Sequence, residues 1–155
     1  MELSDIERAV KALDPDASVK VDKAGRAWIK VSADKIKEVL RELKSKGYNH
    51  LTAITGLDQV KEGVMELLYH LLPESKELPY LTVRASVPRE DPKIDSITDI
   101  FPAALLYEDE VYDMLGVNFV GHPDLKRILL PEELPEGIHP LRKDFKGSIY
   151  KGVSK

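Results

Sequence analysis

The chain of 155 residues contains no cysteine. This absence excludes disulfide bonds, thiolate chemistry, and iron–sulfur or zinc sites ligated by cysteines of this chain. It is also what a reducing compartment favours. Side-chain amides are scarce, since Asn49, Gln59 and Asn118 are the only ones, whereas lysine and glutamate are abundant. That bias is typical of hyperthermophile proteins.

The chain also has no excess of positive charge and no long apolar run. A formal net charge of -4 argues against nucleic acid as a partner, because phosphate binding needs a positive surface. The longest apolar stretch, Val64 to Leu72, is interrupted by Glu66 and His70 and is too short to span a bilayer. The acidic start, Met1 to Asp5, has no apolar core of a secretory signal. We therefore expect membrane association only through partner subunits.

The first half of the chain predicts helices and strands in turn. Ser4 to Glu7 has the pattern of a capping box and predicts the start of a helix that ends before Pro15. A hairpin is expected at 19–31 around Gly25, and a second helix at 33–46. Strands are expected at 50–57 and 80–87.

The segment Val64 to Leu72 is ambiguous. Its apolar residues fit one face of a helix, whereas its length of nine residues and the following Pro73 also fit a buried strand. From the residues alone we favour the helix slightly.

A third helix is predicted at 103–115, ending at Gly116, and it carries several carboxylates. Glu110 and Asp113 lie near each other on a helix and could divide acid and base roles, as in a free-standing hydrolase. A structural role is favoured, because no substrate-positioning motif accompanies them. The carboxylates would then form a solvated acidic face or pair with the basic residues Lys126, Arg127, Arg142 and Lys143.

The C-terminal segment is rich in proline yet apolar. Pro123, Pro131, Pro135 and Pro140 exclude long regular elements. The apolar side chains need a surface to cover them, because exposed apolar area costs about 25 cal/mol per Å²; they are Leu125, Ile128, Leu129, Leu130, Leu134, Ile138, Leu141 and Phe145. We favour another protein as that surface; the alternative is an autonomous adaptor whose arm folds back on its own domain.

The sequence thus predicts an α+β fold, with a small, mostly antiparallel sheet packed with helices and an extended C-terminal arm. We expect an α+β domain at residues 1–116 and a partner-wrapping arm at 117–155. No phosphate-binding glycine motif and no zinc motif built on the four histidines is present. We therefore predict no catalytic, cofactor or metal site in this chain. A metal pair of His122 and His139 is conceivable, but hydrogen bonds that fix turns are favoured for them.

Several blocks of the last third closely resemble the 30-kilodalton subunit family of respiratory complex I, which includes equivalent subunits of membrane-bound hydrogenases. The blocks keep the family's order and near-identical spacing; they are Ser96–Ala104, Tyr107–Gly116, Gly121–Leu125, Arg127–Leu129 and His139–Phe145. The resemblance implies that 64–72 is a strand, and we adopt that expectation. Two departures, Leu105-Leu106 for the usual Asn-Trp and Asp109 for the usual Arg, favour a divergent archaeal hydrogenase-like or ferredoxin-linked branch.

The resemblance also implies a function. It predicts a peripheral, cofactor-free subunit on the cytoplasmic side of the cell membrane, supporting electron transfer coupled to ion translocation. The expected partners are a large subunit of quinone or nickel–iron hydrogenase type and a cluster-bearing small subunit. Iron–sulfur clusters, and nickel–iron or flavin groups, would lie in those partners. The residues expected to bind the partner or order the arm are Glu108, Glu110, Asp113, His122, Asp124, Arg127, His139, Arg142, Asp144 and Phe145.

Overall fold

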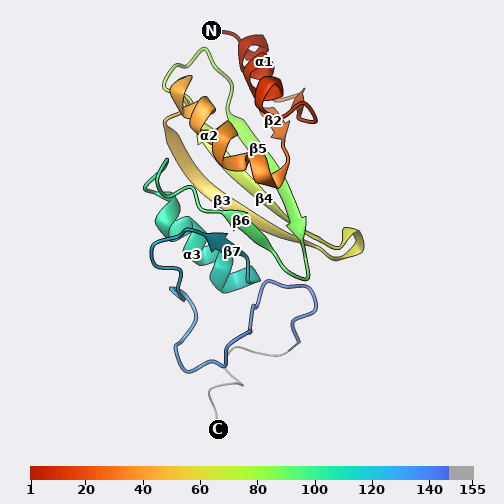
Figure 1. Cartoon of the computed structure of the whole chain (residues 1–155), viewed down its shortest axis with the longest axis vertical. Helices are drawn as coiled ribbons and strands as arrows, with labels where there is room; N and C mark the ends of the chain where they lie inside the picture. The colour runs from red at the N-terminus through yellow and green to blue at the C-terminus, as the bar shows by residue number, and fades with distance from the viewer. Residues whose placement is uncertain (147–155) are drawn as a thin grey trace.

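The computed structural model describes residues 1–146 and is built on a five-stranded sheet (Figure 1). The strand order is β1-β2-β5-β4-β3. Within this sheet β2 and β5 run parallel, and the other neighbours are antiparallel. The predicted α+β fold with a mostly antiparallel sheet is confirmed. The strands are β1 Ser18–Val21, β2 Ala27–Lys30, β3 His50–Gln59, β4 Val64–Leu72 and β5 Leu81–Pro88.

Three helices pack on one face of this sheet. They are α1 Leu3–Leu13, α2 Ile36–Ser45, which follows the 3₁₀ turn η1 Ala33–Lys35, and α3 Ala104–Leu115. Alternate residues of β4 point to that face, and Met65, Leu67, Tyr69 and Leu71 are almost fully buried in one core with residues of all three helices. The other face of the sheet is polar, and its Glu66 carboxylate pairs with Arg84 at 2.7 Å.

The segment Val64–Leu72 is strand β4, so the slight preference for a helix was wrong and the expectation from the family resemblance is confirmed. The strand pairs with β3 on one side and β5 on the other. A central strand under helices is apolar along most of its length, and such a run looks the same as a short buried helix. The 3₁₀ turn η2 Val60–Glu62 connects β3 to β4.

The start of α1 also differs from the prediction. Glu2, rather than Ser4, is the N-cap residue, and the Asp5 carboxylate accepts a hydrogen bond from the Glu2 backbone nitrogen at 3.0 Å. A carboxylate in the first turn compensates unpaired backbone N–H groups as a serine cap would. The capping box therefore lies two residues earlier than the sequence pattern indicated.

Helix α3 lies directly against β3 because Gly56 has no side chain. A Cβ atom at Gly56 would lie 2.3 Å from Cδ1 of Leu115 and 3.1 Å from Cγ1 of Val111. The helix ends at Gly116, whose positive φ of 76° is the left-handed conformation that favours glycine.

A second, two-stranded sheet follows α3. Strand β7 (Asn118–Val120) runs parallel to β6 (Lys93–Asp95). Phe119 of β7 is 1% exposed and belongs to the main core, although β7 falls in the range predicted for the arm. From residue 121 to residue 146 the described chain contains no helix or strand and runs past the end of α3 farthest from the N-terminus (Figure 1). The rest of the predicted arm, residues 147–155, lies outside the described residues.

Among residues 1–146, no helix is long and apolar enough to cross a membrane.

Candidate interaction site on α3 and the arm

Helix α3 buries three of its four carboxylates. Glu108, Asp109 and Asp113 are at most 2% exposed, whereas Glu110 is exposed. The interpretation of a solvated acidic face is therefore wrong for three of the four residues. It failed because the arm covers Asp109 and Asp113 and the loop after β6 covers Glu108, which the helical pattern alone does not reveal.

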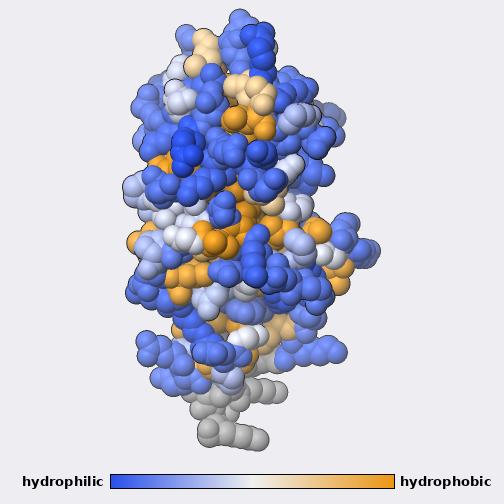
Figure 2. All heavy atoms as spheres, viewed as in Figure 1, coloured by the Kyte–Doolittle hydropathy of each residue, from blue (hydrophilic) through white to orange (hydrophobic). Residues whose placement is uncertain are grey.

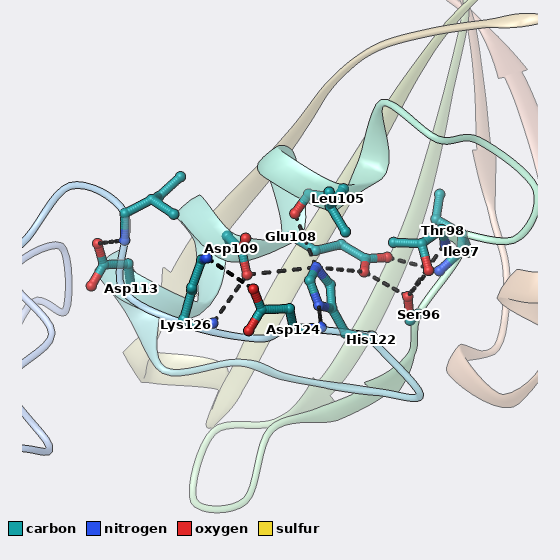
Figure 3. Close-up of polar contacts among 11 residues, drawn as sticks. Ser96, Ile97, Thr98, Leu105, Glu108, Asp109, Asp113, His122, Asp124 and Lys126 are labelled. Atoms are coloured by element: carbon teal, nitrogen blue, oxygen red, sulfur yellow. Dashed lines mark hydrogen bonds and ion pairs between the residues drawn. The ribbon is translucent and has the colours of Figure 1, made fainter.

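Glu108 connects α3 to the loop after β6 (Figure 3). Its carboxylate accepts hydrogen bonds from the Ser96 hydroxyl and the Ile97 backbone nitrogen, both at 2.7 Å. Burial raises the pKa of the Glu108 carboxyl, and these hydrogen bonds offset part of that rise. Because both donors belong to its own domain, Glu108 fixes the start of α3 rather than the arm.

His122 fixes the turn where the arm leaves β7. Its Nδ1 accepts a hydrogen bond from the Asp124 backbone nitrogen at 3.0 Å, and its Nε2 donates to the Leu105 carbonyl at 2.9 Å. This pattern assigns the neutral tautomer with the proton on Nε2. Nε2 also lies 3.5 Å from Oδ1 of Asp109. The Asp124 carboxylate itself pairs with Lys126 at 2.8 Å on the surface.

Asp113 holds three consecutive backbone nitrogens of the arm. Its Oδ2 accepts from the nitrogens of Ile128, Leu129 and Leu130 at 3.2, 2.8 and 3.0 Å. One turn earlier, Oδ1 of Asp109 accepts from the Lys126 nitrogen at 3.1 Å. Hydrogen bonds to a carboxylate are stronger than those between neutral groups. The partners of these carboxylates are thus backbone groups of the arm, not the basic side chains considered from the sequence.

The arm also satisfies the last carbonyls of α3. The His139 Nδ1 donates to the Asp113 carbonyl at 3.0 Å, the Leu141 nitrogen to Met114 at 3.0 Å, and Arg142 Nε to Leu115 at 2.7 Å. These carbonyls have no partner within a helix, and a cation at a helix C-terminus is favourable. We call the contacts of residues 126–142 with Asp109 and with residues 113–115 the α3–arm clamp.

A second anchor holds the arm at the end of β3. Asp58 and Arg89 form a two-pronged ion pair, with nitrogen–oxygen distances of 2.6 and 3.0 Å. The Asp58 carboxylate also accepts from the Lys143 nitrogen at 2.9 Å, and Arg89 contacts the Asp144 carboxylate at 3.1 Å. The hydrogen bond from Arg89 lowers the pKa of Asp58. Asp58 and Arg89 were not among the predicted site residues, because no local pattern connects positions so far apart in the chain.

The remaining predicted site residues have local roles or lie outside the clamp. Arg127 donates to the carbonyls of Pro131, Leu134 and Pro135 and so folds the loop that follows it. The Phe145 nitrogen closes a turn with the Arg142 carbonyl. The exposed Glu110 side chain forms no hydrogen bond or ion pair with any residue of the described range. In particular, Glu110 does not share a cavity with Asp113.

Apolar side chains remain exposed around the clamp. Leu106 is 61% exposed, Leu129 58% and Leu141 61%. Figure 2 shows apolar residues gathered mainly across the middle of the displayed face, at the height of α3. The other partly exposed apolar residues of this region are Leu105, Val120 and Ile128.

The histidines of the arm contact backbone groups. His122 and His139 each use Nδ1 in a hydrogen bond to backbone, as the favoured interpretation of these histidines predicted. Within residues 1–146, no group of three or more histidine, aspartate or glutamate side chains is placed to hold a metal ion.

Comparison with known proteins identifies the family. The family described as "Respiratory-chain NADH dehydrogenase, 30 Kd subunit" matches residues 29–151. A subunit of the NADH-quinone oxidoreductase of Moorella thermoacetica is 41% identical over 117 residues, covering 75% of this chain and 77% of the relative. The membrane-bound hydrogenase subunit beta of Pyrococcus furiosus is 35% identical over 147 residues, covering 89% of this chain and 83% of the relative.

A solved structure agrees with the sequence relatives. A chain in the structure of the membrane-bound sulfane sulfur reductase, an archaeal respiratory membrane complex, matches with a TM-score of 0.78 and 32% identity. The match covers 96% of this chain and 88% of that chain. This chain therefore belongs to the family of the 30-kilodalton subunit of the respiratory-chain NADH dehydrogenase, as its motifs predicted.

Proposed function

We propose that this chain is a peripheral subunit of a complex-I-like membrane-bound oxidoreductase and that it docks on the large subunit through the α3–arm clamp. Membership of the 30-kilodalton family supports the first part. The exposed leucines of the clamp support the second part. The relatives of this chain include subunits of NADH-quinone oxidoreductases and of membrane-bound hydrogenases, and a peripheral subunit of a membrane-bound oxidoreductase is the role common to both.

The observation that carries the docking proposal is that the clamp holds exposed leucines in place. The Leu129 backbone nitrogen is bonded to Asp113, and the Leu141 nitrogen to the Met114 carbonyl. Both side chains nevertheless remain more than half exposed. A fixed backbone loses little further conformational entropy on binding, so apolar side chains presented in this way favour association. The fully buried core of a protein–protein interface is more apolar than the rest of the protein surface, which fits a docking role for these side chains.

Electron transfer would take place in the partner subunits. The chain has no cysteine with which to ligate an iron–sulfur cluster. We therefore propose that it binds no cofactor and that the large subunit and a cluster-bearing small subunit hold the redox groups. Its own role would be to dock and orient those subunits on the cytoplasmic side of the membrane.

Co-purification from cells that express the three subunits together tests this function. We expect the wild-type chain to co-purify with the large subunit, and the double variant Leu129→Ser and Leu141→Ser to lose most of that association. The control is Val21→Ser, because Val21 is 53% exposed on the edge strand β1, away from α3. Equal recovery of the large subunit with the wild type, the double variant and the control would contradict docking through the clamp.

A further inference from the structure

A cavity beside the clamp adjoins a buried acceptor that the described residues do not satisfy. The cavity has a volume of about 540 Å³, and Asp113 lies on its wall. Oδ1 of Asp113 is buried and has no hydrogen-bond partner among the described residues, whereas Oδ2 accepts three backbone donors. In Figure 3 only one of the two oxygens carries a contact. Buried acceptors are nearly always satisfied, so this oxygen indicates that a donor is missing.

The charges around the cavity favour a positively charged donor. Glu132 and Glu136 line it and are exposed, and neither forms an ion pair within residues 1–146. Of the cations of the lining, Lys126 pairs with Asp124, and Arg127 binds backbone carbonyls rather than any of these carboxylates. The lining thus carries three carboxylates that form no ion pair with a described residue, against the single uncompensated charge of Arg127. A cation that enters from outside would balance the remaining negative charge of the lining.

The spread of these carboxylates favours a planar guanidinium over a metal ion. The three carboxylates do not form a group placed to hold a metal in the described range. A guanidinium spreads five N–H donors over a flat fork and can contact acceptors that do not converge on one point. The rings of Tyr112 and His139 also line the cavity, with centroids 6.4 Å apart in an edge arrangement. An arginine can stack on such a ring.

We infer that this cavity receives an arginine side chain of the large subunit, which pairs with Glu132 and Glu136 and extends toward Asp113. The inference rests on the proposed function for the identity of the partner. It adds a polar, orienting contact to the apolar contacts of Leu129 and Leu141. Such a pair at the edge of an interface mainly sets specificity and orientation.

The first test uses the full chain alone and ethylguanidinium chloride as the probe. We expect saturable NMR shifts of the Gly137 and Glu132 amides at concentrations far below those that denature proteins, with sodium chloride as the ionic control. The double variant Glu132→Gln and Glu136→Gln should weaken this binding roughly tenfold. Glu133→Gln should not, because Glu133 is exposed but does not line the cavity. Absence of saturable shifts in the wild-type chain would overturn the inference.

The second test measures association with the large subunit. We expect Glu132→Lys with Glu136→Lys to weaken it at least tenfold and Glu133→Lys to leave it unchanged. Equal effects of both changes would overturn the inference. If the double variant Lys151→Ala and Lys155→Ala binds ethylguanidinium more tightly than the wild type, a lysine of this chain competes for the cavity. That result would overturn the inference of a partner arginine. If no association occurs even for the wild type, the proposed function fails, and the ethylguanidinium titration still decides whether the cavity binds guanidinium.

Discussion

The replacement Asp113→Asn tests whether one carboxylate holds the arm to α3. Three backbone nitrogens donate to Oδ2 of Asp113, at 3.2, 2.8 and 3.0 Å. Asparagine has nearly the same shape but no charge. A hydrogen bond to a charged group contributes about 1 kcal/mol more than a neutral one. Three such bonds predict a loss of about 3 kcal/mol in the free energy of local opening.

Hydrogen exchange of the Ile128, Leu129 and Leu130 amides measures that free energy directly. A loss of about 3 kcal/mol corresponds to exchange roughly a hundredfold faster. The amides of β4 should keep their rates, because the opening is confined to the arm. Glu110→Gln is the matched control, since it makes the same chemical change on the same helix at an exposed position. If both variants leave arm exchange unchanged, or both accelerate it equally, Asp113 does not hold the arm.

Three further changes test the packing around α3. Burial raises the pKa of Glu108 above its ordinary 4.5, so between these two pKa values the folded chain holds a proton that the unfolded chain has lost. The free energy of unfolding should therefore fall as the pH rises from about 4.5 to the pKa of the folded chain. Glu108→Gln should flatten that fall, measured by urea unfolding at several pH values. An unchanged pH profile would refute this. Asp58→Asn should lower the free energy of unfolding by at least about 2 kcal/mol in urea, because it breaks the pair with Arg89. Asp144→Asn, at an exposed position, should lower it by less than about 1 kcal/mol. A larger loss for Asp144→Asn than for Asp58→Asn would contradict the second anchor. Gly56→Ala should lower the stability by about 1–3 kcal/mol in thermal unfolding, because the new Cβ would overlap Leu115. Unaltered unfolding would show that α3 can move away freely.

The sequence predicts those elements whose patterns depend on local periodicity. The hairpin of β1 and β2, helices α2 and α3, and strand β5 lie close to their expected ranges. Strand β5 alternates apolar and polar residues because one face packs under the helices and the other does not. The run in β4 is apolar at nearly every position, so its strand conformation follows from pairing with β3 and β5, which only tertiary structure supplies.

The candidate site was predictable only in part. The family motifs singled out Asp113, His139 and Arg142, and the structure brings all three together at the end of α3. They also included Glu110, which lies outside these contacts. Burial of the α3 carboxylates was not foreseeable, because it depends on where the arm and the loop after β6 lie. That these residues bind a partner stays a prediction.

The central claim is that the large subunit covers the exposed leucines of the clamp, Leu129 and Leu141, together with the neighbouring Leu106 of α3. Hydroxyl-radical footprinting of the chain, alone and in the purified complex, tests it most directly. We predict that Leu106, Leu129 and Leu141 react in the free chain and become several-fold less reactive in the complex, while Val21 on β1 reacts equally in both. Equal reactivity of the three leucines in the free chain and the complex would contradict the account.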